Sequence, residues 1–172
     1  MRILSFLVLF FLSFSGCHSQ SKAPDANKIV TSLYEIEYDS SFFDVYNQKN
    51  DGFVLFFKSE NDDDFLDCIK LSIENTEKYK TMDLDYYASL MVHLLQESGK
   101  IVENKKVAGE DGFSYYSVVC EKPSASGTFK IYQRIYFHKG YGLNLSLRTV
   151  SGKFDRLFTS SDKIFQSFKL LN

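Results

Sequence analysis

Two runs of alternating apolar residues, joined by a short Gly-containing link, constrain the fold more than any other feature of the chain. The apolar positions are Ile131, Ile135 and Phe137 in the first run and Leu143, Leu145 and Leu147 in the second. Alternation of this kind is typical of strands with one buried face, and a short link of this type joins two strands as an antiparallel hairpin. We therefore predict a hairpin over residues 129–150.

The register of this hairpin follows if both apolar sets are buried together on one face. Directly opposed residues point to the same face, so Phe137 would face Leu143 and Ile135 would face Leu145. This pairing requires a three-residue loop, Lys139-Gly140-Tyr141, in which a glycine supplies the positive φ. The other face would then carry polar and aromatic side chains: Tyr132, Arg134, Tyr136, Asn144, Ser146 and Arg148.

Four of these residues form a candidate binding face: Tyr132, Arg134, Tyr136 and Arg148. Tyr and Arg combine a large contact area with polar groups and are frequent at binding hot spots. Alternatively, a helix covers part of this face and the remainder is solvated strand surface, which often carries the same residue types. If the face is open, replacing Tyr132 and Arg134 by alanine would abolish partner binding and leave the melting temperature nearly unchanged.

The rest of the chain alternates between strand and helix patterns. Further strands are expected over residues 34–39, 52–58, 65–73, 101–107 and 113–121. A helix with apolar residues at 3-4 spacing should follow an N-cap at Thr81 or Asp83 and end at Ser98-Gly99. A last helix should run from a Ser151 cap to just before Phe168. The expected fold class is α+β.

The N-terminus has the features of a secretion signal. Met1-Arg2 is followed by an almost wholly apolar run, Ile3–Phe14. That run is shorter than the about 20 residues that a membrane-spanning helix needs, but it suits a signal peptide. The stretch Leu12–Cys17 (LSFSGC) resembles the bacterial lipobox. This resemblance implies a signal peptide over residues 1–16, cleavage before Cys17, and acyl chains on Cys17 that anchor the protein to a membrane of the bacterial envelope.

The alternative is ordinary signal-peptidase cleavage, which would leave Cys17 as an unmodified thiol. In either case the domain lies outside the cytoplasm. Residues 17–33 are expected to be the modified cysteine and a polar tether, followed by one globular domain over residues 34–172. The sequence does not specify whether the inner or the outer membrane receives the anchor.

Composition excludes some classes of partner and site. The net charge of −2 offers no basic field for nucleic acid. Cys68 and Cys120 could form a disulfide in an oxidising envelope, but buried free thiols are the favoured interpretation. No His or second Cys stands at zinc-ligand spacing from either cysteine.

The order of the elements resembles the PsbP-like domain, which is shared with DcrB-type and LpqN-type lipoproteins and with the Ran-binding Mog proteins. The resembling stretches are Phe42–Phe57, Asp83–Ser98, Gly112–Tyr116, Tyr132–Arg148 and Phe154 to Phe165-Gln166-Ser167-Phe168. The resemblance implies an antiparallel sheet sandwiched between helices, and no common catalytic site.

No pattern in the chain predicts a catalytic, cofactor or metal site. His18, His93 and His138 stand in no nucleophilic triad, zinc or phosphate-loop motif. The acidic run Asn61–Asp64 favours a solvated turn over a calcium loop. The leading hypothesis is a non-enzymatic envelope lipoprotein that binds a partner or a ligand. An envelope hydrolase or transferase, and a chaperone-like factor that shelters an apolar segment, remain as alternatives.

Overall fold

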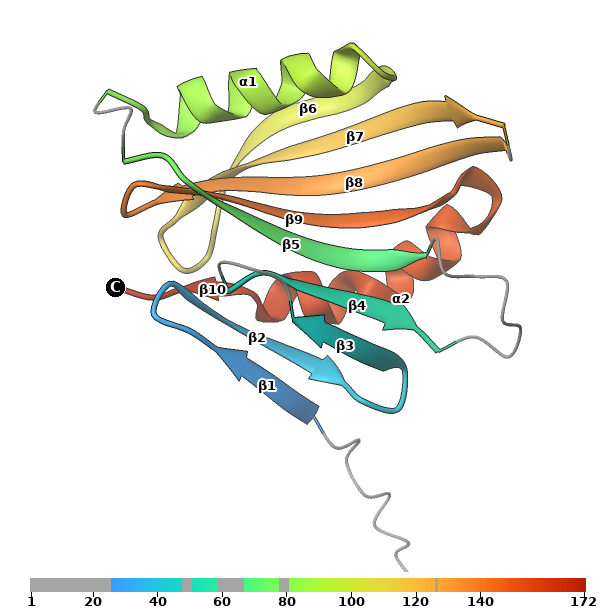
Figure 1. Cartoon of the computed structure of the whole chain (residues 1–172), viewed down its shortest axis with the longest axis horizontal. Helices are drawn as coiled ribbons and strands as arrows, with labels where there is room; N and C mark the ends of the chain where they lie inside the picture. The colour runs from blue at the N-terminus through green and yellow to red at the C-terminus, as the bar shows by residue number, and fades with distance from the viewer. Residues whose placement is uncertain (1–25, 48–50, 59–66, 78–80, 126) are drawn as a thin grey trace, which may run out of the picture.

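The computed structural model describes residues 26–47, 51–58, 67–77, 81–125 and 127–172. Its strands form two antiparallel sheets (Figure 1). The larger sheet has seven strands in the order β3 (Phe43–Asn47), β4 (Phe53–Phe57), β5 (Cys68–Asn75), β9 (Tyr141–Val150), β8 (Gly127–His138), β7 (Ser114–Ser124) and β6 (Lys100–Ala108). The smaller sheet has the order β1 (Ala26–Val30), β2 (Tyr34–Asp39) and β10 (Lys169–Leu170).

The two helices lie on opposite faces of the larger sheet. Helix α1 (Leu84–Gln96) covers β6, β7 and β8, and helix α2 (Phe154–Ser167) lies on the other side with the smaller sheet (Figure 1). The Asp83 carboxylate is the N-cap of α1, since it accepts a hydrogen bond of 2.8 Å from the backbone N–H of Tyr86. A short 3₁₀ turn, Ser151–Lys153, leads into α2. The predicted α+β sandwich is confirmed.

Each face of the larger sheet has its own core. The main core lies between the sheet, α2 and the smaller sheet, and it is rich in fully buried Leu, Ile and aromatic residues such as Tyr34, Phe53, Leu145 and Phe165. A smaller core lies under α1 and consists of Tyr87, Ala88, Val118 and Ile135. Both faces of the central strands are therefore covered.

The hairpin of β8 and β9 forms as predicted, but the predicted register is wrong by one residue. His138 pairs with Tyr141 and Tyr136 pairs with Leu143, so the turn contains two residues, Lys139 and Gly140. Both turn residues have positive φ, 49° and 77°. This is the geometry of a type I′ turn, which matches the right-handed twist of the flanking strands better than a type I or type II turn does.

The physical reason for the error is that both faces of the hairpin are buried. The leucines of β9 (Leu143, Leu145 and Leu147) face α2, whereas Ile135 and Phe137 of β8 face α1. The two apolar sets need not share a face when each has its own core, so alternation alone does not select the register.

The first strand, β1, lies before the domain start that the sequence indicates. The sequence placed the domain start at residue 34, but β1 pairs with β2 from Ala26 opposite Asp39 to Val30 opposite Glu35. The pairing is reinforced by an ion pair of 2.8 Å between Lys28 and Glu35. Cys17, the preceding signal and the Asn61–Asp64 run lie outside the described residues.

The two remaining cysteines lie on strands that are not neighbours. Cys68 is on β5 and Cys120 on β7, with β9 and β8 between them, and both are free thiols. The favoured interpretation of free thiols is confirmed, although only Cys120 is buried and Cys68 is half-buried. In the described part of the chain, no helix is long and apolar enough to span a membrane.

Candidate functional site

The polar and aromatic side chains of β8 lie beneath α2. The ring of Tyr132 lies edge-on to that of Phe165, at 4.9 Å between ring centroids. The ring centroids of Tyr136 and Phe168 are 5.1 Å apart. Both tyrosines are buried, at 7% and 3% exposure. They are part of the main core, so the helix covers most of the face that the sequence suggested as a binding surface.

Arg134 joins β8 to the end of the helix. Its Nη1 donates a hydrogen bond of 2.7 Å to the carbonyl oxygen of Phe165, and its Nε donates one of 2.9 Å to the hydroxyl of Tyr132. The last four carbonyls of a helix lack partners within the helix, and a cation near them also stabilises the helix dipole. Arg134 therefore acts as a C-terminal cap of α2.

Arg148 lies on the other face of the sheet. It pairs with Ile131, is exposed, and places its guanidinium 4.6 Å from the centre of the Phe129 ring. The one-residue difference in register is the reason, because it moves every side chain of β9 to the opposite face relative to β8. The four residues of the predicted binding face therefore do not form a single surface.

An open groove lies beside this packed region, where α2 leaves β6 and β7 uncovered. Its volume is about 590 Å³. The strands supply Val102, Glu103, Lys105, Val107, Tyr115, Ser117, Val119, Lys130 and Tyr132, and the start of α2 supplies Phe154, Asp155 and Phe158. Tyr132 is the one residue of the predicted binding face that lines this groove.

Strand register arranges the floor of the groove in rows. One row consists of Lys105, Ser117 and Arg134 on three successive strands, and the next consists of Glu103, Val119 and Tyr132. Ser117 is buried at 4% exposure, so its hydroxyl lies at the bottom of the groove. The walls are apolar or aromatic, and the charged side chains stand toward the edge strand and the start of the helix.

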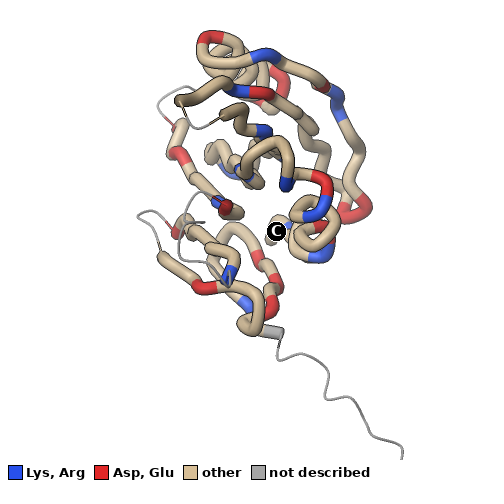
Figure 2. The backbone as a smooth tube through the Cα atoms, turned by 90° about the vertical axis from the view of Figure 1, so that its right-hand side faces the viewer, with Lys and Arg blue, Asp and Glu red and all other residues tan. Residues whose placement is uncertain are grey.

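The charges of the groove are of both signs. Lys105 forms an ion pair of 2.8 Å with Glu103, and this hydrogen bond raises the pKa of Lys105. The ammonium group of Lys130 lies 4.4 Å from the centre of the Phe154 ring. Burial raises the pKa of the Tyr115 hydroxyl, which keeps it a neutral donor. Acidic and basic residues are also interspersed over the view in Figure 2, in keeping with the small net charge.

The histidines of the ordered domain lie elsewhere. His93 on α1 is solvent-exposed and lies 3.7 Å from the carboxylate of Glu97. His138 lies 2.8 Å, by its Nε2, from the carbonyl oxygen of Leu171. Within the described ranges no three or more His, Cys, Asp or Glu side chains gather at a possible metal site. The groove presents aromatic surface, hydroxyls, ammonium groups and the carboxylates of Glu103 and Asp155, a mixture that suits noncovalent binding.

The sequence did not indicate this groove. The one sequence signal was the run over residues 101–107, which carries one acidic and two basic side chains and, in the structure, no buried position. Such a strand is typical of a sheet edge, and β6 is the edge strand here, with a bulge between Ile101 and Glu103. Strand patterning alone does not show how far a helix covers the neighbouring face.

Comparison with solved structures shows the fold of the chain. Cyanobacterial PsbP from Synechocystis has a TM-score of 0.60 at 14% identity, over 91% of this chain and 99% of its own. The Ran-binding protein Mog1p of Saccharomyces cerevisiae has a TM-score of 0.58 at 8% identity, over 87% and 97%. A Pseudomonas aeruginosa protein of unknown function has a TM-score of 0.54 at 9% identity, over 83% and 94%. The chain thus has the PsbP-like fold that its element order resembles.

No protein-family model matches the sequence, and no curated protein matches it either.

Proposed function

We propose that this PsbP-like domain is a non-catalytic binding module, held at a membrane of the bacterial envelope by acyl chains on Cys17. The observation that carries the binding function is the groove between β6, β7 and the start of α2. It is open to solvent, and aromatic side chains of two elements, Tyr115 and Phe158 among them, line it. A specific binding site typically combines partly buried aromatic surface with a few polar groups, here ammonium groups and a buried hydroxyl.

The argument for the anchor comes from the sequence before β1. The LSFSGC stretch ends at Cys17 and begins within the apolar run Ile3–Phe14, which is too short to span a membrane. One acyl chain binds a membrane only marginally, whereas two or three hold a protein there. The proposal therefore includes full acylation of Cys17 and a domain that faces the space outside the cytoplasm.

The groove suits an extended apolar or aromatic segment of a partner better than a compact polar ligand. Its floor follows the strands, and its two ammonium groups, on Lys105 and Lys130, stand at the margin. One structural neighbour, Mog1p, is a Ran-binding protein, so a domain of this fold can serve as a protein-binding module. In this chain we assign that role to the groove.

Photo-crosslinking in cells tests the groove. A photoreactive phenylalanine analogue placed at Val102, at the rim of the groove and 51% exposed, should give a discrete crosslinked product. The same analogue at Leu94, which is 54% exposed on α1, is the matched control. The proposal is supported if this product is lost when Lys130 is also replaced and is missing from the Leu94 variant. No product at Val102, or the same products at both positions, would contradict it.

Labelled palmitate tests the anchor separately. The wild-type chain should incorporate label and stay with the membrane fraction, whereas the Cys17→Ser variant should do neither. Label in that variant, or none in the wild type, would refute acylation at Cys17 without bearing on the groove.

A further inference from the structure

The turn between β2 and β3 carries an exposed aromatic side chain. Among the described residues, Phe42 is the most exposed large apolar side chain, at 64%. Phe43, the next residue, is buried in the main core. Phe42 directly precedes β3, and Tyr46 within β3 is 56% exposed, with its ring edge-on to that of Phe56 at 5.3 Å between centroids. Two aromatic residues thus face solvent along the edge strand of the larger sheet.

This turn lies close to the point where the N-terminal segment enters the domain. Ala26 pairs with Asp39, and the backbone N–H of Phe42 donates a hydrogen bond of 3.1 Å to the carbonyl of Asp39. Paired residues on adjacent strands are about 5 Å apart and the ends of a β-turn less than about 7 Å, so Phe42 lies within about 12 Å of Ala26. Figure 1 shows the turn at the same end of the molecule as the start of β1.

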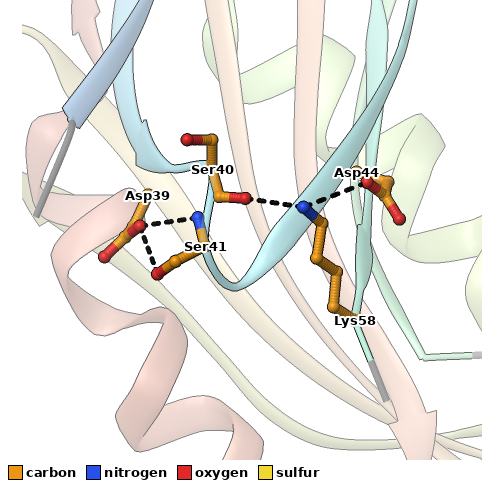
Figure 3. A network of polar contacts seen from close by, with 5 residues as sticks. All are labelled: Asp39, Ser40, Ser41, Asp44 and Lys58. Carbon is orange, nitrogen blue, oxygen red and sulfur yellow. Dashed lines mark hydrogen bonds and ion pairs between the residues drawn. The ribbon is translucent and has the colours of Figure 1, made fainter. Parts of the chain in front are cut away.

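The backbone of the turn is held firmly in place (Figure 3). The carboxylate of Asp39 accepts hydrogen bonds from the backbone N–H and the hydroxyl of Ser41, at 2.8 and 2.6 Å. The ammonium of Lys58 donates a hydrogen bond of 2.8 Å to the carbonyl of Ser40 and pairs with Asp44 at 3.3 Å. The backbone N–H of Lys58 donates one of 2.8 Å to the carbonyl of Phe42. The polar groups of the turn are therefore engaged with each other, while the Phe42 ring projects into solvent.

We propose that the β2–β3 turn is the surface by which the domain rests on the lipid membrane, with Phe42 inserted into the bilayer interface. This inference builds on the acylation of Cys17 in the proposed function. Eight residues, 18–25, separate Cys17 from Ala26, so the backbone between them can reach no further than about 32 Å. An anchored chain of this length therefore keeps the turn within reach of the bilayer surface.

The two aromatic residues should lie at different depths. Phe42 is fully apolar and nearest to the chain entry. Tyr46 is four residues further along, about 13 Å at strand spacing, and its ring is polar at one end. The exposed apolar residues of α1, which are Tyr86, Leu90 and Leu94, lie across the larger sheet from the turn (Figure 1). Insertion should therefore decrease from Phe42 to Tyr46 and be absent at Leu94.

The absence of tryptophan from the chain allows a direct test. Three variants, Phe42→Trp, Tyr46→Trp and Leu94→Trp, each introduce a single fluorophore at an exposed site. Each acylated full-length protein is reconstituted into vesicles of phosphatidylcholine with a minor fraction of phosphatidylglycerol, with or without brominated acyl chains. We expect Phe42→Trp to lose most of its fluorescence to the brominated lipid and to emit at shorter wavelength. Tyr46→Trp should be quenched less, and Leu94→Trp not at all.

Flotation of the same samples distinguishes a failure of the Cys17 anchor from a failure of the proposed membrane contact at the turn. If the proteins float with the vesicles but Phe42→Trp is no more quenched than Leu94→Trp, the anchor stands and the turn is not a membrane contact. If Tyr46→Trp is quenched more than Phe42→Trp, the proposed orientation is likewise overturned. If the acylated proteins do not float, the anchor itself fails, and this inference falls with it.

Discussion

Arg134 offers a sharp test of how the sheet and the helix hold each other. We consider the Arg134→Met variant, which keeps most of the aliphatic chain and removes the guanidinium. The substitution removes the hydrogen bonds to the Phe165 carbonyl and the Tyr132 hydroxyl. It also removes the cation–aromatic contact of the guanidinium with the Tyr115 ring, whose centre lies 4.9 Å away. The residue is half-buried, so water can replace part of this loss.

The expected loss in the free energy of unfolding follows from the kinds of contact that Arg134→Met removes. A hydrogen bond from a charged group contributes about 1.5–3 kcal/mol, and a partly exposed cation–aromatic contact about 0.5–1 kcal/mol. With partial replacement by water, we expect Arg134→Met to lower the free energy of unfolding by about 2–4 kcal/mol. For a domain of this size that lowers the melting temperature by about 5–15 °C. This expected loss differs from the sequence-based prediction that replacing Tyr132 and Arg134 together by alanine leaves the melting temperature nearly unchanged.

Arg148→Met is the matched control. Its guanidinium is exposed and contacts the ring of Phe129 at 4.6 Å, so its loss should cost about 0.5–1 kcal/mol. Thermal and urea unfolding followed by circular dichroism measures both variants. Hydrogen exchange should also speed up at the C-terminal turn of α2 in Arg134→Met alone. Equal stability losses in the two variants, or unchanged exchange at Phe165–Phe168, would refute the capping role.

Three further predictions concern the face under α1 and the cysteines. A Cβ on Gly142 would overlap the ring of Tyr87, so Gly142→Ala should lower the free energy of unfolding in urea by about 1–3 kcal/mol, and by less in a Tyr87→Ala background. Burial raises the pKa of Tyr87 to about 12. In the unfolded chain a tyrosine ionises at about pH 10, so the folded state loses stability as the pH rises from about 10 to about 12. Tyr87→Phe should therefore move alkaline unfolding to higher pH. Burial raises the thiol pKa of Cys68 and Cys120, so both should react with a disulfide reagent slowly in native protein and rapidly in urea.

The elements that the sequence predicted well are those in which local pattern and burial agree. Strand β2 and helix α1 have apolar residues at a period that matches their buried face, and Asp83 is the kind of residue that caps a helix. Strand β1 was missed because its five residues, ANKIV, carry little alternation, and its pairing with β2 is a tertiary event.

The groove and the hairpin register could not be derived from local pattern. The groove and the register both depend on which face of each strand a helix covers. The sequence-based register placed Leu145 of β9 on the same face as Ile135 of β8, whereas the two side chains point to opposite faces. Once α2 is placed over β8 and β9, the buried tyrosines and the capping Arg134 follow, and so does the uncovered strip of β6 and β7. The position of a helix over a sheet is set by the whole core.

The two proposed surfaces lie at opposite edges of one sheet, which has a consequence for the kind of partner. Strand β3, next to the Phe42 turn, is one edge of the seven-stranded sheet, and β6, which forms the wall of the groove, is the other. Six spacings of about 4.8 Å separate them, up to about 29 Å before twist is considered. If the turn rests on the bilayer, the groove stands well above the lipid surface. A partner that crosslinks at Val102 should therefore be a soluble protein or an exposed segment of an envelope protein, and a bilayer-embedded helix as the crosslinked partner would contradict this orientation.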